Sequence, residues 1–292
     1  MGKKMKILIV DRKLQNDNWP FKEGQEFYDA FKKLDHDVTI AGKDYEVSES
    51  KIQQCYEDNK FDFCLITENY WDDWSWFDFS KIHCPKLFWA IDYDHTRYAQ
   101  AKIIQNFCMK NKFSHIFVID TKMIESGKQI TGINHSYLPY ATSDKFCEKS
   151  INKDVDVGFI GSPYDDRVMM FPKNTQYING VIGDKYLEAI SRIKINLNYS
   201  ITNGMNGKVF EILGCKGFLL TNNTHDSHKM FGNFLPLYES RGDLMEKVDY
   251  YLKHDNERDK IRYTCYDYVM KNETYVQRAE KIIELIFMKD YI

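Results

Sequence analysis

Short apolar runs alternate with segments of helical periodicity along most of the chain. The runs are continuously apolar rather than alternating, which is typical of strands in a parallel sheet that helices cover on both faces. Strands are predicted at residues 7–10, 38–40, 63–66, 87–91 and 116–119, and again at 155–160, 177–182, 195–197, 218–221 and 235–238. Helices are predicted at 21–34, 52–56, 97–111 and 207–215, and in succession from residue 241 to residue 286. The pattern predicts an α/β fold.

A polar stretch at residues 144–154 has no clear period and is the best candidate for a linker between two domains. We therefore expect two Rossmann-like domains with parallel sheets. The predicted boundaries are 1–148 for an N-terminal domain and 149–274 for a C-terminal domain, with a helical C-terminal tail at 275–292 that could pack back on the N-terminal domain. Ligands of open parallel sheets lie outside the carboxyl ends of the strands, so the loops that follow the strands should carry the chemistry.

The most informative of these loops leads into the helix predicted at 207–215. Asn206 and Gly207 give a flexible backbone, and the N–H groups at a helix start can bind phosphate. Lys208 adds a positive charge on the first turn, where the helix dipole is unfavourable for a cation. A bound anion nearby would explain a lysine at this position. Glu211 follows one turn later on the same face, where its carboxylate could accept hydrogen bonds from ribose hydroxyls. The alternative is an ordinary loop–helix junction with an exposed Lys–Glu pair.

A second candidate follows the strand predicted at 155–160. Gly161 and Ser162 would offer backbone N–H groups to a phosphate at the carboxyl edge of the sheet. Arg167 could pair with the same phosphate. The alternative is a tight turn in which Arg167 pairs with a neighbouring aspartate or is solvated.

A third candidate follows the strand predicted at 218–221. Thr224 and His225 lie at the same expected edge and could contact a sugar or a phosphate. His225 with His228 also suggests a metal site, but two histidines without a nearby third ligand are a weak signal. The alternative is a polar loop in which Asp226 or Ser227 caps a helix.

The N-terminal domain offers a candidate for proton transfer. The strand predicted at 87–91 would deliver Asp92 to its carboxyl end, and His95 follows closely. A carboxylate or an imidazole there could take the proton of an acceptor hydroxyl; for His95 the alternative is a plain residue at a helix start. The aromatic and acidic run at 70–79 could be a loop that stacks on an acceptor, or a loop packed on the domain surface.

Composition narrows the class of protein. Hydrophobic residues make up 43% of the 292, enough for a full core, and the formal net charge of -3 lacks the basic footprint of a dedicated nucleic-acid binder. Seven scattered cysteines without a Cys-x-x-Cys pair are typical of reduced thiols in a cytoplasmic protein rather than of disulfides or a zinc site. No apolar run approaches the length of a transmembrane segment. We expect a cytoplasmic protein without a metal or a cofactor.

Residues 206–221, which read NGKVFEILGCKGFLLT, are similar to the signature of the spore-maturation-type (CgeB/YkvP-like) glycosyltransferases. Two more segments resemble that family in the right order: residues 138–144 with 154–162 at its domain crossover, and residues 251–278 in its closing helices. The resemblance covers the second half of the chain well and the first half weakly. It implies a GT-B fold, in which the two domains face each other across a central cleft. It also implies a nucleotide-diphosphate sugar as the donor, held by the second domain, with the first domain on the acceptor side.

The resemblance also implies roles for single residues. Glu211 matches the position expected on the ribose, and Asn206 and Lys208 match positions near the diphosphate. Lys208 stands where the family usually has Arg, so the charge is kept and the bidentate fork is lost. Many related enzymes carry an acidic residue eight positions before this Glu, where this chain has Asn203, so Asn203 inherits no role. Asp92 matches an acidic position of the first domain.

The expected function is metal-independent, hexosyltransferase-like transfer of a sugar from the nucleotide sugar to an unidentified hydroxyl of a glycan, a protein, a small molecule or a modified nucleobase. If the enzyme inverts, Asp92 or His95 would be the base; if it retains, no side-chain base is required there. Three alternatives stay open. The chain could be a non-catalytic nucleotide- or sugar-binding protein on a degenerate GT-B scaffold, a glycosyltransferase that modifies DNA bases, or a GT-A enzyme that holds a metal through Asp92 and Asp94.

Overall fold

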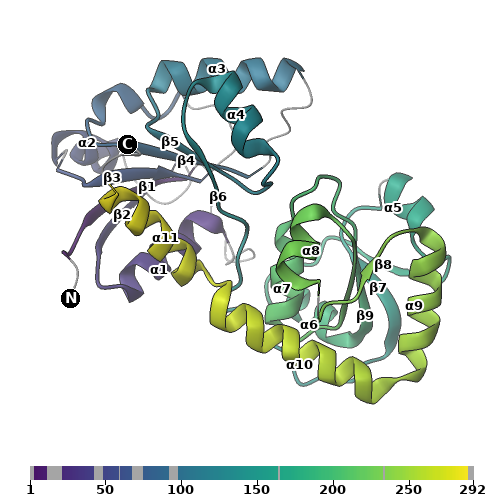
Figure 1. Cartoon of the computed structure of the whole chain (residues 1–292). Helices are drawn as coiled ribbons and strands as arrows, with labels where there is room; N and C mark the ends of the chain where they lie inside the picture. Colours follow the sequence, from purple (N-terminus) through teal and green to yellow (C-terminus); the bar gives the residue numbers. More distant parts are fainter. Residues whose placement is uncertain are drawn as a thin grey trace. The chain divides into compact units, whose positions relative to one another are not determined.

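The chain forms two compact units, each with a parallel sheet and helices (Figure 1). The computed structural model describes residues 3–11, 22–42, 49–58, 60–67, 75–91, 98–163, 165–232 and 234–288. Unit 1 comprises the chain up to Pro139 together with the segment from Tyr275 onward, and unit 2 is Tyr140–Thr274. Two α/β units with parallel sheets, followed by helices, are the architecture that the apolar runs predict, and the structure confirms it.

Unit 1 is built on a six-stranded sheet in the order β2-β1-β3-β4-β5-β6, and every neighbouring pair is parallel. Its strands are β1 (Lys6–Val10), β2 (Asp37–Ala41), β3 (Phe63–Ile66), β4 (Lys86–Ala90), β5 (His115–Val118) and β6 (His135–Tyr137). Its helices are α1 (Glu23–Lys33), α2 (Glu49–Asp58), the 3-10 turn η1 (Phe79–Lys81), α3 (Tyr98–Asn111), α4 (Met123–Thr131) and α11 (Tyr275–Phe287). Every residue of β3, β4 and β5 is buried, because helices cover both faces of the sheet (Figure 1).

The helix α11 belongs to unit 1 although it follows unit 2 along the chain. The ring of Tyr275 makes an edge contact with Phe27 of α1, at 5.3 Å between ring centroids, and Trp89 packs against both rings. The guanidinium of Arg278 is buried, and its Nε donates to the carbonyl oxygen of Pro139 at 2.9 Å. These contacts hold α11 beside α1 (Figure 1).

Unit 2 is built on a five-stranded sheet in the order β11-β10-β9-β7-β8, again with parallel neighbours. Its strands are β7 (Val155–Ile160), β8 (Gln176–Ile178), β9 (Ile193–Asn198), β10 (Leu219–Asn222) and β11 (Leu237–Tyr238). Its helices are α5 (Asp165–Met170), α6 (Asp184–Arg192), α7 (Gly207–Gly214), α8 (His225–Phe231), α9 (Arg241–Lys253) and α10 (Asp255–Asn272). Side chains of β7, β9 and β10 form one core with α9, and this core includes Phe159, Ile195, Leu220 and Leu244.

The boundary between the units lies earlier than the predicted end of the first domain at residue 148. The backbone N–H of Thr142 donates to the carbonyl oxygen of Glu273 at 2.9 Å, so the chain is already part of unit 2 there. Gly214 of α7 is pressed against the same segment, since a Cβ on it would come 2.1 Å from Thr142 Oγ1 and 3.1 Å from Phe146 Cβ. The start of the polar stretch therefore packs on α7 rather than forming a free linker.

Short or polar elements differ most from the prediction. The pattern of apolar residues did not reveal α4, α5 or β6, and β6 has only three residues, of which His135 is buried. The N-cap of α6 is Gly183, and Asp184 is the first helical residue. The Asp184 carboxylate accepts from Lys149 Nζ at 2.9 Å.

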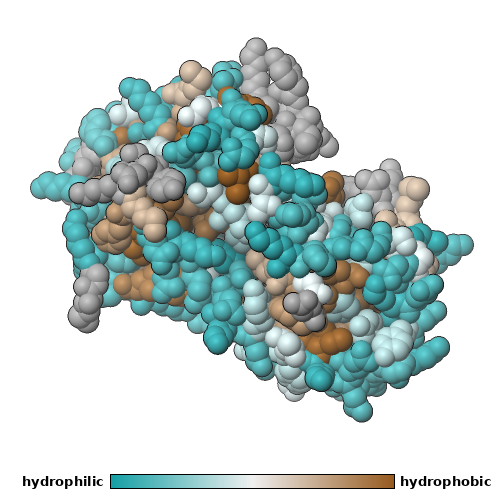
Figure 2. Space-filling model, viewed as in Figure 1, coloured by the Kyte–Doolittle hydropathy of each residue, from teal (hydrophilic) through white to brown (hydrophobic). Residues whose placement is uncertain are grey.

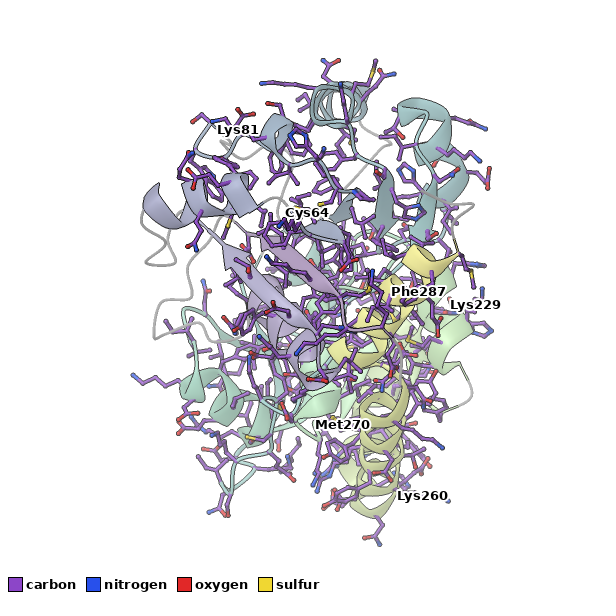
Figure 3. The ribbon with its side chains drawn as sticks, turned by 90° about the vertical axis from the view of Figure 1, so that its left-hand side faces the viewer. Cys64, Lys81, Lys229, Lys260, Met270 and Phe287 are labelled. Carbon is purple, nitrogen blue, oxygen red and sulfur yellow. The ribbon has the colours of Figure 1, made fainter. Side chains whose placement is uncertain are left out.

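The surface of both units is mostly polar on the face seen in Figure 2, where hydrophobic atoms form small groups. Within the described ranges, none of the helices has the length and hydropathy that a membrane span requires. All seven cysteines are free, and most are buried; Cys64, labelled in Figure 3, lies in the sheet of unit 1. Burial raises the pKa of the Cys84 thiol to about 11 and that of Cys108 to about 12, which keeps them protonated near neutral pH.

Candidate functional site

The candidate residues of unit 2 gather at one edge of its sheet. β7, β9 and β10 are parallel neighbours, so their carboxyl ends and the loops that follow lie at the same edge. The loop after β7 contains Gly161 and Ser162, the loop after β9 leads to Lys208 and Glu211 on α7, and the loop after β10 leads to Thr224. The fold thus brings together residues that are far apart along the chain.

Lys208 reaches from the first turn of α7 to the end of β7. A Cβ on Gly161 would lie 2.8 Å from Lys208 Nζ, and Nζ is 5.5 Å from the centre of the Phe159 ring. Gly161 has a φ of 136°, which side-chain-bearing residues rarely adopt. The backbone conformation therefore favours glycine here, and a Cβ would displace the Lys208 amine.

Two cationic side chains lie against one ring at this edge. The Arg167 guanidinium carbon is 5.1 Å from the centre of the Phe159 ring that Lys208 also approaches, and Arg167 donates to the carbonyl oxygen of Ser162 at 3.2 Å. Among the residues that the structure describes, no carboxylate lies within ion-pair distance of the Lys208 amine. Burial lowers the pKa of Lys208, and Arg167 lowers it further while Glu211 acts to raise it. The site therefore favours an anionic ligand.

Glu211 lies one turn after Gly207 on α7 and points back toward the helix start. Its Oε1 would be 3.3 Å from a Cβ on Gly207, and its Oε2 accepts a hydrogen bond from the hydroxyl of Tyr186 on α6. Tyr186 is buried, with 3% of its surface exposed. No local pattern in the sequence connects Tyr186 with the site, because its partner Glu211 lies on another helix.

Asn206 is tied to the sheet. Its Nδ2 donates to Asn198 Oδ1 at 3.0 Å, and Asn198 Nδ2 donates to Thr221 Oγ1 at 3.0 Å. Asn206 occupies the N-cap position of α7, but its side chain makes no capping hydrogen bond. These side-chain hydrogen bonds connect the loop before α7 to the ends of β9 and β10. A direct contact of Asn206 with a diphosphate stays a prediction.

Thr224 is the cap of α8. Its Oγ1 accepts from the backbone N–H of Ser227 at 3.1 Å, and its own N–H donates to Ser227 Oγ at 2.8 Å, which completes a capping box. The prediction that Asp226 or Ser227 is the capping residue is therefore wrong. His225 and His228 are exposed, and no group of three potential metal ligands occurs among the described residues.

The structure cannot be used to place the candidate residues of unit 1. Asp92, Asp94 and His95 lie outside the described residues, as does the first part of the aromatic run, residues 70–74. Their proposed part in proton transfer or metal binding stays a prediction.

Two acids that the sequence analysis did not single out stand at the carboxyl edge of the sheet in unit 1. Asp11, directly after β1, has no exposed surface; its Oδ2 accepts from the N–H of Gly24 at 3.0 Å and from Thr67 Oγ1 at 3.2 Å. Asp120, after β5, is also buried and accepts from the N–H of Lys122 at 2.9 Å. An aspartate immediately after an apolar run is the signal that could have identified both.

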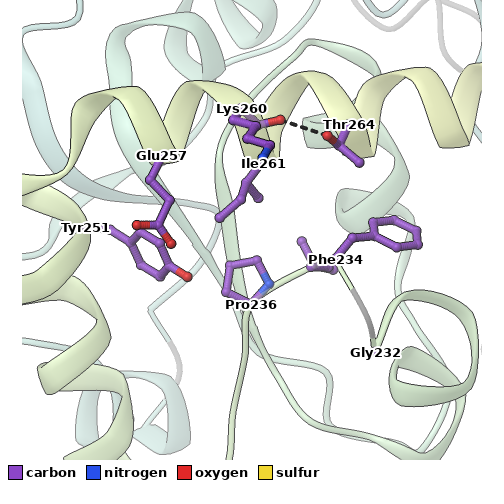
Figure 4. A pocket seen from close by; sticks show the side chains of 9 residues that line it. Gly232, Phe234, Pro236, Tyr251, Glu257, Lys260, Ile261 and Thr264 are labelled. Atoms are coloured by element: carbon purple, nitrogen blue, oxygen red, sulfur yellow. Dashed lines mark hydrogen bonds between the residues drawn. The ribbon is translucent and has the colours of Figure 1, made fainter.

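A cavity of about 440 Å³ lies elsewhere in unit 2 (Figure 4). The loop that enters β11 forms one wall with Phe234 and Pro236, and α9 and α10 form the other with Tyr251 and Ile261. Because this loop precedes β11, the cavity is at the amino end of that strand, whereas the candidate residues follow the carboxyl ends of β7, β9 and β10. The cavity is therefore separate from the candidate site.

Comparisons with known proteins give a consistent result. Residues 144–284 match the family model of glycosyl transferase-like proteins. The chain is similar to an alpha-glucosyltransferase solved with UDP and a 13-mer DNA containing an HMU base, with a TM-score of 0.68 and 11% identity over 98% of this chain and 100% of that one. It is also similar to the HepE protein of Anabaena in complex with UDP and glucose, with a TM-score of 0.61 and 10% identity over 97% of this chain and 100% of that one. A third similar structure is sucrose-phosphate synthase of Thermosynechococcus elongatus, with a TM-score of 0.64 and 7% identity over 98% of this chain and 99% of that one. No curated protein sequence matches the chain.

These identities establish a shared fold and not a shared substrate. The similar structures cover both units, and the family model covers most of unit 2 and most of α11. The narrower resemblance to the spore-maturation-type enzymes stays a prediction. The chain has the GT-B fold, and its residues 144–284 match the glycosyl transferase-like family model.

Proposed function

We propose that the protein transfers a hexose from a nucleoside-diphosphate sugar to a hydroxyl group. The observation that carries this proposal is the partly buried amine of Lys208, held over Gly161 beside Arg167 with no described carboxylate at ion-pair distance. A buried cation is stabilised when an anion neutralises it, and a diphosphate provides that anion. Several structures similar to this chain contain UDP, which supports uridine as the first nucleotide to test.

Each group at the edge has a role in this proposal. Lys208 and Arg167 stabilise the negative charge that develops on the leaving diphosphate, so protein cations supply what a metal ion supplies in other transferases. The first N–H groups of a helix have no partner within that helix and suit a phosphate, which assigns this role to the start of α7 at Gly207. The carboxylate of Glu211 accepts hydrogen bonds from the ribose. The N–H of Gly161 already donates to the carbonyl oxygen of Ile178 at 2.8 Å, so the prediction that it binds phosphate is wrong, and that role is left to the N–H of Ser162.

In the proposed reaction, the oxygen of the acceptor hydroxyl forms a bond to the anomeric carbon. The bond from that carbon to the diphosphate oxygen breaks, and the nucleoside diphosphate leaves with the electron pair. The hydroxyl proton passes to a base, for which Asp92 and His95 are the predicted candidates if the configuration inverts, or to the leaving phosphate if it is retained.

The test is a panel of nucleotide sugars. UDP-glucose, UDP-galactose, UDP-N-acetylglucosamine and GDP-mannose are each added to the protein, and its melting temperature and the release of nucleoside diphosphate are measured. One of them should raise the melting temperature, because a ligand that binds the folded state stabilises it, and should be consumed slowly by hydrolysis. Failure of all four to bind would overturn the proposal. Binding without any consumption, with glycan and nucleobase acceptors present, would favour a non-catalytic binding protein.

A second candidate function is glycosylation of a modified DNA base. The observation in its favour is the likeness over nearly the whole chain to alpha-glucosyltransferase structures that contain DNA. The formal net charge of -3 does not favour it, because duplex binding depends on basic surface. Transfer of labelled glucose from UDP-glucose to a duplex with a hydroxymethylated base, compared with the unmodified duplex, decides the matter. Equal, negligible label in both would reject this acceptor.

A further inference from the structure

The carboxylate of Glu211 is held by a residue from a different helix. Tyr186 lies on the first turn of α6, and its hydroxyl donates to Glu211 Oε2. Tyr186 is buried and Glu211 is half-buried, so the hydrogen bond is partly shielded from water. Hydrogen bonds to a charged group in a shielded place are stronger than those between neutral groups in water.

The second oxygen of Glu211 faces the start of α7. Oε1 would be 3.3 Å from a Cβ on Gly207, and the ring of Tyr140 would be 3.4 Å from the same Cβ. Both distances are short, so the space that a side chain of Gly207 would take is a narrow gap between Oε1 and the Tyr140 ring. Lys208 is the neighbour of Gly207 and its amine lies at the end of β7, so a ligand whose diphosphate reaches Lys208 passes close to this space.

The hydroxyl of Tyr186 remains a donor over the physiological range of pH. Burial raises the pKa of Tyr186 well above its usual value, and the neighbouring charge of Glu211 raises it further. A protonated phenol next to a carboxylate can only donate to it. The side chain of Glu211 has several rotamers that cost entropy when a ligand selects one, and a fixed hydrogen-bond donor removes that cost before the ligand arrives.

We propose that Tyr186 is a positioning residue that holds Glu211 so that Oε1 accepts a hydrogen bond from a ribose hydroxyl, which makes the site select ribonucleotides over deoxyribonucleotides. This inference rests on the proposed function, because it requires a nucleotide at the start of α7. In this inference Tyr186 itself does not contact the ligand.

The experiment measures affinities for UDP, 2′-deoxy-UDP and inorganic pyrophosphate by calorimetry, in the wild type and in Tyr186→Phe. The ratio of the UDP affinity to the 2′-deoxy-UDP affinity should fall in the variant, with UDP binding weakened about tenfold, as expected for a lost hydrogen bond to a charged group. Pyrophosphate should bind equally well to both proteins, because it does not reach the ribose position. Tyr250→Phe is the matched control: Tyr250 also donates to a glutamate, Glu257 Oε2, but on the exposed surface of unit 2.

Two outcomes would overturn the inference while leaving the proposed function intact. One is an unchanged ratio of UDP to 2′-deoxy-UDP affinity in Tyr186→Phe. The other is an equal loss of affinity for all three probes, which would show that Tyr186 only supports the fold. Failure of the wild type to bind UDP, GDP or ADP would overturn the proposed function and the inference with it.

A second variant guards against a folding defect in Tyr186→Phe. Glu211→Gln keeps the shape of the side chain and removes its charge, so it should lower the same ratio. Adding Tyr186→Phe to Glu211→Gln should lower the ratio no further, because both changes act on one interaction. Additive effects of the two substitutions on the ratio would contradict a role of Tyr186 that acts through Glu211.

Discussion

The two sheets differ in the charged side chains described at the edge where their strands end. In unit 1, the buried carboxylates of Asp11 and Asp120 accept hydrogen bonds from N–H groups of the same unit. In unit 2, Lys208 and Arg167 lie against Phe159, and the Lys208 amine has no described carboxylate at ion-pair distance. In unit 1 the acids hold loops of the same unit, whereas in unit 2 the cations are the proposed partners of a ligand. Substitution of the buried acids of unit 1 should therefore lower the stability of the protein. Substitution of the cations of unit 2 should lower its affinity for the proposed ligand.

The largest expected effect is the loss of donor binding in Lys208→Ala. Removing a charged partner of a phosphate should cost about 2–3 kcal/mol, or on the order of 30- to 150-fold in affinity for the nucleotide sugar. The affinity is measured by calorimetry. Lys229→Ala removes an exposed lysine of α8, labelled in Figure 3, and should leave the affinity as it is. Equal affinities of Lys208→Ala and the wild type would remove the contrast between the two edges.

The next effect is a loss of stability in Asp11→Ala. The variant leaves the N–H of Gly24 and the hydroxyl of Thr67 without their acceptor in a buried place, at a cost of about 2 kcal/mol in the free energy of unfolding. Urea unfolding measures this loss, with the exposed Asp35→Asn as the control. Because Asp11 is in unit 1, the affinity for the nucleotide sugar should change little. A large loss of affinity at unchanged stability would give Asp11 a ligand role and weaken the comparison.

A smaller effect, about tenfold in affinity, is expected for Gly161→Ala. The new Cβ would come 2.8 Å from Lys208 Nζ and displace the amine, in addition to straining a backbone with a φ of 136°. Gly180→Ala is the matched control: Gly180 also has a positive φ, 71°, but no atom lies within 4 Å of its added Cβ. Both variants should lose stability, and only Gly161→Ala should lose affinity. The same loss of affinity in both would mean that strain, and not the amine, is responsible.

The smallest effect is a few-fold loss of donor affinity at alkaline pH. Burial lowers the pKa of Lys208 below 10.5, so the unbound protein loses this charge at a lower pH than an exposed lysine would. The diphosphate binds the charged form, so affinity should fall as the pH rises through the lowered pKa. Over the same range the unfolded chain holds more protons than the folded one, so the stability contributed by Lys208 should rise. Lys208→Arg, which stays charged, should abolish the pH dependence of affinity.

The sheets could be predicted from the sequence where apolar runs are long. The predicted strands at 63–66 and 155–160 coincide with β3 and β7, whose residues are nearly all buried. The run at 177–182 was predicted too long, because β8 ends at Ile178 and Gly180 adopts a left-handed φ of 71° that no strand uses. Periodicity records burial along a segment, and it does not reveal a turn within an apolar run.

The site could be predicted only as far as its residues lie in one segment. Lys208 and Glu211 share a helix start, which is visible in the sequence. The contact of Lys208 with Phe159 and Gly161 depends on strand pairing, and the bond from Tyr186 to Glu211 depends on how α6 packs on the sheet. Such contacts between distant segments follow from the fold, so no local pattern contains them.

The return of the chain to unit 1 through α11 has a consequence for synthesis. Unit 2 is one continuous segment, Tyr140–Thr274, whose ends are joined by the bond from Thr142 N–H to the Glu273 carbonyl. It therefore needs no residue of α11 to complete its fold. Unit 1 begins earlier but cannot finish earlier, because Phe27 and Trp89 are covered only once Tyr275 has emerged. The half of the protein that is translated first is thus expected to be the last to mature.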